Sequence, residues 1–291
     1  IVYLFALAGA KLATFKIGHF NPYLEVYPSS KTLVLPGENK LLLEDKKSGI
    51  VLDHFDKFAS DYERLAFKQS IGLEHLSKRE TSFIDKHIKN DKSTLSYLDI
   101  GVGTGRNTEI LLNKGIVVTG VDFSQNMLNE AKQKLGKYVA KGQLRLQRID
   151  LNKELPFRNG EFDGTLCLRV IKYVTNWMNC ISEAGRVIKE DGVFILEISN
   201  RYSVAGISQF YRDYFTFQPA EVEEALAKAG FAVLDKRAGS KLPFILYRSI
   251  NSEKALKFVN KIEVVLRNAL GQLFSRNLIY YCRKTRSRRG V

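Results

Sequence analysis

A glycine-rich loop is the segment of this 291-residue chain whose residue types are best suited to holding a ligand. Gly101, Gly103 and Gly105 stand between a predicted strand at 96–100 and a predicted helix at 106–114. Glycine tolerates positive φ angles and lets a ligand approach the backbone closely. The start of a helix adds free N–H groups and a partial positive charge. The pattern therefore predicts a site for a carboxylate, a phosphate or a nucleotide-like ligand.

The residues after the loop argue against two common nucleotide motifs. A nicotinamide fingerprint, GxGxxG/A, keeps its last position small, and counted from Gly101 that position is the large, charged Arg106. A phosphate-binding P-loop requires a Lys directly after its last glycine, and none follows Gly105. The ligand is therefore predicted to be neither NAD nor a nucleoside triphosphate.

Two carboxylates at predicted strand ends favour an adenosine. Asp122 ends the second strand, 21 residues after Gly101, where it can accept hydrogen bonds from both ribose hydroxyls. Asp150 ends the third strand, where it can accept from an adenine amino group. An N-cap role is the structural alternative for each acid.

The elements that position these residues alternate between strand and helix. Predicted strands lie at 96–100, 116–121, 144–149, 163–168, 193–198, 231–234 and 278–282. Predicted helices lie at 53–65, 70–89, 106–114, 125–135, 177–190, 219–229 and 252–272. Ser124 is a predicted N-cap, and Gly115 and Gly230 follow predicted helix ends. This alternation predicts an α/β fold with a mostly parallel sheet and helices on both faces.

Six segments in this order resemble the motifs of the class I, Rossmann-like S-adenosylmethionine-dependent methyltransferases. The resemblance is to the broad group that includes quinone-biosynthesis and small-molecule methyltransferases, and it covers about residues 53–284. The segments are Leu98–Asn107, Val118–Met127, Asp150, Phe162–Leu168, Arg186–Ile195 and Phe217–Phe231. Each is weak alone, and their order and spacing carry the resemblance.

The resemblance implies a fold, a cofactor and a set of site residues. It implies a three-layer sandwich whose seven-stranded sheet has an antiparallel last strand. It also implies that S-adenosylmethionine lies on the glycine loop, with Asp99 orienting the methionine end and Asp122 holding the ribose. The residues it assigns to the cofactor are Asp99, Gly101, Gly103, Gly105, Asp122, Phe123, Met127, Asp150, Leu151 and Arg169.

One stretch departs from the family pattern. After the fourth strand the family often has a small or polar residue and then two histidines, whereas this chain continues Arg169-Val-Ile-Lys-Tyr173. Methyl transfer needs a base only if the acceptor must lose a proton. Candidates for that base, each with core or lid packing as its alternative, are His54, Tyr62, Tyr173, Tyr211 and Tyr214.

Two segments are predicted to form a lid over the acceptor. Residues 200–217 are rich in aromatic side chains, and residues 240–276 contain an amphipathic helix. Their apolar character predicts a hydrophobic, small-molecule or lipid-linked acceptor.

Cysteine and histidine patterns give no sign of a metal site. Three scattered cysteines without a CxxC pair indicate reduced thiols and a cytoplasmic location. The four histidines form no closely spaced pair, so no metal is predicted.

The formal net charge of +14 is concentrated late in the chain. Residues 236–291 hold 14 Lys and Arg against 2 Asp and Glu, and a basic tail is predicted at 285–291. A solvated tail, peripheral contact with an anionic membrane and nucleic-acid binding all remain open. An RNA methyltransferase, with tRNA as substrate, and a non-catalytic cofactor-binding protein are the alternative functions.

Residues 1–50 are predicted to form a small β-rich extension of unknown role. A Pro36-Gly37 turn separates two apolar runs there, as in a hairpin. The apolar run Ile1–Ala10 is interrupted by Lys11, well short of the roughly 20 residues that span a membrane.

Overall fold

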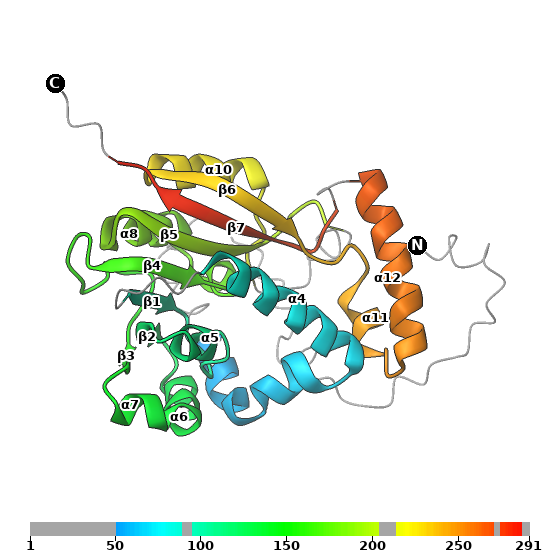
Figure 1. The fold of residues 1–291 in the computed structure, drawn as a ribbon, viewed down its shortest axis with the longest axis horizontal. Helices are drawn as coiled ribbons and strands as arrows, with labels where there is room; N and C mark the ends of the chain where they lie inside the picture. The colour runs from blue at the N-terminus through cyan, green and yellow to red at the C-terminus, as the bar shows by residue number, and fades with distance from the viewer. Residues whose placement is uncertain (1–50, 89–94, 204–213, 271–273, 287–291) are drawn as a thin grey trace, which may run out of the picture. The chain divides into compact units, whose positions relative to one another are not determined.

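The computed structural model describes residues 51–88, 95–203, 214–270 and 274–286. Within them, seven strands form one sheet in the order β3-β2-β1-β4-β5-β7-β6 (Figure 1). The strands are β1 Ser96–Ile100, β2 Val117–Asp122, β3 Leu144–Arg148, β4 Phe162–Cys167, β5 Ile188–Ser199, β6 Phe231–Ala238 and β7 Asn277–Lys284. β7 runs antiparallel to both of its neighbours, and the remaining pairs are parallel. The predicted sheet, with its antiparallel last strand, is confirmed.

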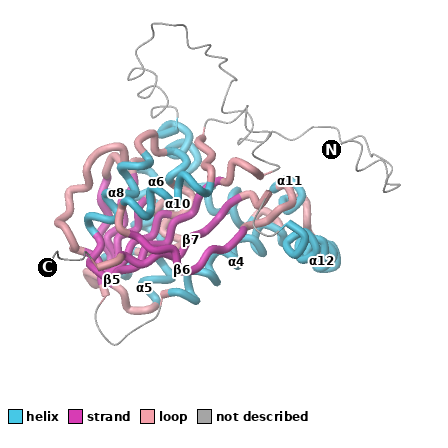
Figure 2. Tube along the Cα trace, turned by 90° about the horizontal axis from the view of Figure 1, so that it is seen from above, coloured by secondary structure: helices cyan, strands magenta, loops and turns pink. Residues whose placement is uncertain are grey.

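Helices cover both faces of this sheet (Figure 2). On one face, α8 and α10 contribute Ile181, Ala184 and Val222 to a core shared with β4, β5 and β7. On the other face, α4 and α5 pack Ile84 and Leu111 against β1 and β2. The helices are α4 Ile71–His87, α5 Thr108–Asn113, α6 Gln125–Lys134, α7 Gly136–Ala140, α8 Trp177–Val187, α10 Pro219–Lys228, α11 Phe244–Arg248 and α12 Glu253–Leu270.

Local signals set several of the helix ends. The Ser124 hydroxyl accepts a hydrogen bond from Met127 N at 3.1 Å, which makes it the N-cap of α6 as predicted. Gly115 has a φ of +80° beyond the end of α5. Helix α8 ends at Val187 rather than at residue 190, because Ile188 already pairs with Phe162 in the sheet.

The first described helix is broken, whereas the sequence predicted a continuous one. Residues 51–58 are helical and lead through a 3₁₀ turn, Ala59–Asp61, to a π-helical turn, Arg64–Lys68. The π turn buries three consecutive residues, Leu65, Ala66 and Phe67, which a regular 3.6-residue period does not place on one face.

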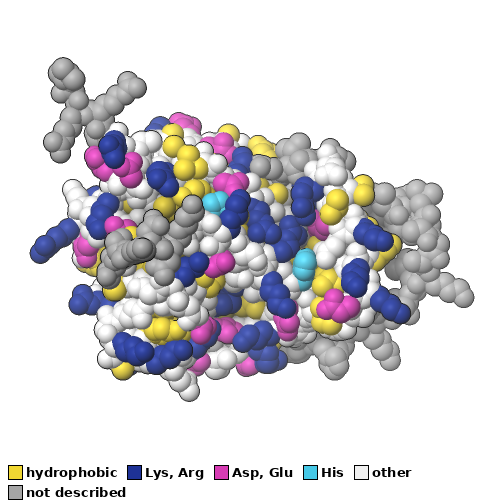
Figure 3. Space-filling model, viewed as in Figure 1, with side chains coloured by type: hydrophobic (Ala, Val, Ile, Leu, Met, Phe, Trp, Pro, Cys, Tyr) yellow, Lys and Arg dark blue, Asp and Glu magenta, His cyan; other side chains and the backbone are white. Residues whose placement is uncertain are grey.

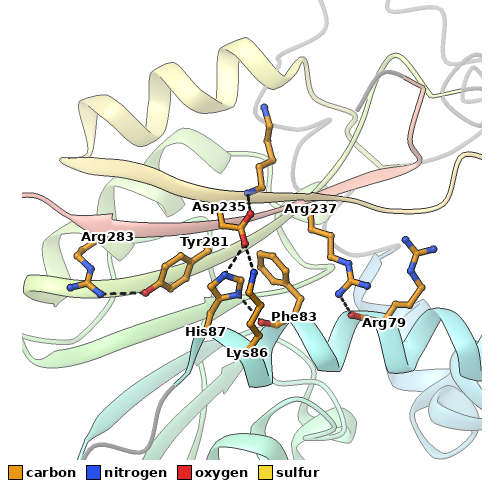
Figure 4. Close-up of polar contacts among 9 residues, drawn as sticks. Arg79, Phe83, Lys86, His87, Asp235, Arg237, Tyr281 and Arg283 are labelled. Atoms are coloured by element: carbon orange, nitrogen blue, oxygen red, sulfur yellow. Dashed lines mark hydrogen bonds and ion pairs between the residues drawn. The ribbon is translucent and has the colours of Figure 1, made fainter. Parts of the chain in front are cut away.

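Helix α4 crosses the sheet beside β6 and β7 (Figure 4). Near its C-terminal end, Asp235 of β6 accepts from Lys86 Nζ at 3.0 Å and lies 2.9 Å from His87 Nε2. Near its N-terminal end, Leu73 packs with Tyr247 of α11 and Val259 of α12. These contacts tie the C-terminal end of α4 to β6 and its N-terminal end to α11 and α12.

Several predictions concern residues that the structure does not describe. The predicted β-rich segment 1–50, residues 204–213 of the predicted lid and residues 287–291 of the basic tail lie outside the described residues. Of that tail, Arg286 is described and lies 2.8 Å from Asp191 in an exposed ion pair. None of the helices described has the length and apolarity needed to traverse a bilayer.

Candidate functional site

A cavity of about 330 Å³ opens at the edge where the parallel strands end. The carboxyl ends of β1 to β4 meet there, as expected for ligand sites in open α/β sheets. Gly101 follows β1, Asp122 ends β2, Asp150 follows β3 and Arg169 follows β4, and all four line the cavity. The sequence motifs are thus brought together in space.

The glycine loop forms the cavity floor with positive backbone angles. Gly101 and Gly103 have φ angles of +72° and +54°. A Cβ at Gly101 would lie 2.0 Å from Val170 Cγ2, so this position has no room for a side chain. A Cβ at Gly103 would meet nothing within 4 Å, because this backbone faces open space. One glycine is therefore needed for close packing and the other leaves the backbone approachable.

Asp122 is clamped by backbone donors on both sides. Its Oδ2 accepts from Gly103 N at 2.9 Å, and its Oδ1 accepts from Ser124 N at 3.0 Å. Burial raises its pKa to about 6, against the opposing effect of these hydrogen bonds. Since Ser124 caps α6, Asp122 is not the N-cap, and its carboxylate faces the cavity instead.

Asp99 and Gly105 lie behind the cavity wall and do not line it. Asp99 is 3% exposed and accepts from Thr108 Oγ1 at 2.5 Å, at the start of α5. Burial raises the pKa of Asp99 to about 7. A Cβ at Gly105 would lie 2.5 Å from Leu135 Cδ1, so this glycine allows the loop to pack on α6. Both residues therefore stabilise the glycine loop without lining the cavity.

The side of the cavity near β3 is mainly apolar. Phe123, Met127 and Leu151 line it together with Asp150. The Asp150 side chain is 47% exposed and accepts from Asn152 N at 3.0 Å. A flat apolar ring with a polar edge fits between these groups.

Residues 51–68 form the opposite wall. The Phe55 ring lies 5.1 Å from Tyr173 and 6.0 Å from Phe123, and Tyr62 also lines the cavity. This wall is tied to the loop by Thr104 Oγ1, which donates to Glu63 at 3.0 Å. This wall is therefore largely aromatic.

Some of the candidate bases line the cavity and others do not. Tyr62 and Tyr173 line the cavity, whereas His54 does not and packs against Phe58 at 5.1 Å. Burial lowers the pKa of His54. Tyr214 lines a different cavity, and Tyr211 lies outside the described residues. The residue type of His54 and its place on the predicted helix 53–65 made it a candidate, but the sequence did not show which way its ring points.

An arginine cluster closes the end of the site, and the sequence did not predict it. The guanidinium carbons of Arg106 and Arg169 lie 3.9 Å and 4.6 Å from the centroid of the Phe67 ring. Arg106 forms a buried ion pair with Glu80 of α4. Burial alone would raise the pKa of Glu80, but Arg106 and Arg169 hold it below its ordinary value. Arg169 itself has a left-handed backbone, with a φ of +66°.

The groups that line the cavity fit S-adenosylmethionine. Asp122 and Asp150 are acceptors for hydroxyl and amino groups, Arg169 is a donor for a carboxylate, and apolar side chains suit an adenine ring. Lysine, the usual partner of a nucleotide phosphate, is not among the lining residues that the structure describes. The described residues also contain no group of His, Cys, Asp and Glu that could hold a metal ion.

Comparison with known proteins agrees with this geometry. Residues 98–196 match the family model of a methyltransferase domain. A demethylmenaquinone methyltransferase of Leptospira interrogans is 35% identical over 152 residues, which are 51% of this chain and 60% of that protein. An uncharacterised protein of Methanocaldococcus jannaschii is 32% identical over 186 residues, covering 61% of this chain and 80% of that protein.

A solved structure shows the same fold. Magnesium protoporphyrin IX methyltransferase from Synechocystis, with bound S-adenosylmethionine, superimposes with a TM-score of 0.58 at 17% identity. The match covers 82% of this chain and 97% of that one. Taken with the family model and the sequence relatives, the strand order and the lining of the cavity lead to one conclusion. The chain belongs to the class I, Rossmann-like methyltransferases, whose cofactor is S-adenosylmethionine.

Proposed function

We propose that this chain transfers a methyl group from S-adenosylmethionine to a small-molecule acceptor. The observation that carries the proposal is the buried Asp122 carboxylate, fixed by Gly103 N and Ser124 N at the end of β2 and facing a cavity of about 330 Å³. The chain spans 60% of the Leptospira relative's length, so the relative's substrate does not transfer directly. That relative is a demethylmenaquinone methyltransferase, and the Synechocystis structure is of a porphyrin methyltransferase. Both names support a small-molecule acceptor.

The residues around the cavity have separate roles in this proposal. Asp122 accepts from the ribose hydroxyls, and Phe123, Met127 and Leu151 enclose the adenine, with Asp150 at its edge. Arg169 holds the carboxylate of the methionine end. Asp99 acts as a positioning residue, because its bond to Thr108 fixes the start of α5 beneath the loop.

When bound, the cofactor supplies a sulfonium methyl group that is already activated for in-line displacement. The protein then has two tasks, to align the acceptor and to exclude water. The aromatic wall of Phe55, Tyr62 and Tyr173 performs the second task. Tyr173, which lines the cavity, is the candidate to take a proton from acceptors that must lose one.

Two measurements test the proposal. Calorimetry with S-adenosylhomocysteine, the demethylated cofactor, measures binding to the purified full chain, with Asp122→Ala as the impaired variant. Mass spectrometry of cell extracts incubated with the chain and methyl-labelled cofactor then identifies the product. Binding together with a labelled small molecule is expected.

Other outcomes separate the alternatives. Label in RNA would replace the small-molecule acceptor with a nucleic acid. Binding without any labelled product would indicate a non-catalytic cofactor-binding protein. No binding of S-adenosylhomocysteine would contradict the proposal as a whole.

A further inference from the structure

A second cavity, of about 60 Å³, lies beside the first. Its wall combines α4 with the ends of β5 and β6, the start of β7 and Phe244 of α11. Phe67 and Arg169 line both cavities, so the two adjoin at these side chains. A buried water needs roughly 10–15 Å³ of such space, so the second cavity has room for a few heavy atoms, as in a carboxylate or phosphate group.

The lining of this second cavity is strongly cationic. It contains five cationic side chains, Arg79, Arg169, Lys172, Arg237 and Arg276, and two acidic ones, Glu80 and Glu197. Glu80 is already ion-paired with Arg106, which lines the first cavity. Figure 3 shows Lys and Arg side chains gathered on this face of the molecule, where α4 passes the late strands.

Arg79 and Arg237 are two neighbouring cations of this lining. Arg237 extends from β6 to α4, where it donates to the backbone oxygen of Arg79 at 2.6 Å (Figure 4). Neither guanidinium has a carboxylate within 4.0 Å among the described residues. Glu263 acts on Arg79, and Asp235 on Arg237, only from beyond that distance. At the other end of the same helix, Lys86 is paired with Asp235 at 3.0 Å. Two neighbouring, half-buried arginines without an ion-paired carboxylate suit an anionic ligand.

Glu197 gives a second, independent sign of a ligand. It lies near the carboxyl end of β5, is 8% exposed, and accepts from Asn277 Nδ2 through Oε1. Its Oε2 is buried and has no hydrogen-bond partner among the described residues. Burial, followed by the charge of Glu80, raises the pKa of Glu197 and favours its protonated, donating form. An unsatisfied buried polar atom is costly, and a ligand oxygen would satisfy it.

We propose that the methyl acceptor carries an anionic group, a carboxylate or a phosphate, which binds in the second cavity to Arg79 and Arg237 and accepts a hydrogen bond from Glu197. This inference rests on the proposed methyltransferase function. The reacting part of the acceptor lies in the first cavity, and its anionic group reaches past Phe67 and Arg169. The second cavity thereby selects acidic acceptors and fixes their orientation.

The test titrates sodium phosphate and, separately, sodium succinate into the full chain by calorimetry, with and without S-adenosylhomocysteine. The two salts distinguish a phosphate site from a carboxylate site. Arg79→Met and Arg237→Met should each weaken binding of the preferred anion about tenfold, because each removes a charge-assisted hydrogen bond. Lys86→Met, which removes the same charge from α4 outside the cavity, should change it less than twofold.

Glu197→Gln separates an anionic group from a cationic one. Glutamine keeps a donor at this position and, unlike glutamate, cannot become negatively charged, so anion binding should be retained or tightened. Protection of Arg79 and Arg237 from phenylglyoxal by the bound anion, mapped by peptide mass spectrometry, tests the wild-type chain without depending on the folding of a variant.

Three results would overturn the inference. These are no anion binding in either state, equal losses in Lys86→Met and Arg79→Met, and weaker anion binding in Glu197→Gln. Because the anion is also titrated without the cofactor product, failure to bind S-adenosylhomocysteine would count against the proposed function separately.

Discussion

The two adjoining cavities are built in different ways. The backbone sets the shape of the first cavity, which is lined by a glycine loop and the ends of four parallel strands. These strand ends occur along the chain in the same order as the sequence motifs. Long side chains from α4, β5, β6 and β7 set the shape of the second. The first cavity is lined by both acids and arginines and suits a cofactor that carries both positive and negative charges, whereas the second cavity has an excess of cations. The difference indicates that the first cavity is shaped for one ligand, the cofactor. The second cavity determines which acceptors bind.

The comparison predicts that a backbone change has the largest effect on the first cavity. In Gly101→Ala, the new Cβ would lie 2.0 Å from Val170 Cγ2 at a φ of +72°. Left-handed strain and overpacking together should lower the free energy of unfolding by about 3 kcal/mol and abolish measurable binding of S-adenosylhomocysteine. Urea denaturation and calorimetry measure the two effects.

Gly115→Ala is the matched control. Gly115 has a φ of +80° but no atom within 4 Å of its Cβ position, so only backbone strain of about 1 kcal/mol is expected. Equal losses in the two variants would show that contact with Val170 does not shape the cavity.

A side-chain change at the same cavity should have the next largest effect. Asp122→Asn removes the charge that accepts from the ribose, and S-adenosylhomocysteine should bind about a hundredfold more weakly. Asp150→Asn should cost only about threefold, because the Asp150 side chain is 47% exposed and water competes for its hydrogen bonds. Calorimetry at pH 8 compares the two, and a larger loss at Asp150 would reverse their proposed roles.

The pH dependence of binding should reveal the same carboxylate. Burial raises the pKa of Asp122 to about 6, and only its ionised form accepts two hydroxyl hydrogen bonds. Affinity for S-adenosylhomocysteine should therefore fall about tenfold from pH 7 to pH 5. Asp122→Asn should flatten this profile, and an unchanged profile in the variant would assign the titration to another group.

Tyr173→Phe should have the smallest effect of this set. The ring contact with Phe55 at 5.1 Å survives, and an activated sulfonium needs no obligatory base. The rate of product labelling should fall less than about threefold. General-base catalysis is worth about a hundredfold or more, so a loss of that size would make Tyr173 the base.

Sequence reasoning was most successful where position along the chain determines position in space. Strand ends of a parallel sheet meet at one edge, so Gly101, Asp122 and Asp150 could be placed together from their spacing alone. It also identified Arg106 as incompatible with a nicotinamide site, and the structure gives the reason for its presence, the buried pair with Glu80.

The second cavity could not be predicted in this way. Arg79 and Arg237 are 158 residues apart, and nothing local to either indicates that they meet. The sequence pattern also could not predict the direction of side chains. His54 shares a helical segment with Phe55 yet does not line the cavity. The π turn that places Phe67 beside two guanidinium groups has no sequence signature that we recognise.

The position of β7 between β5 and β6 has a consequence for how the protein matures. Strand β6 is synthesised before β7, and among the described strands it pairs with β7 alone. Once β5 has been synthesised, every pairing partner of β1 to β4 is present, while the outer edge of β5 stays unpaired until residues 277–284 are made. The cofactor-binding half can therefore assemble on the ribosome, and the acceptor-selecting half is a late, long-range folding event. Nascent chains stalled before β7 should depend most on chaperones that shield open strand edges.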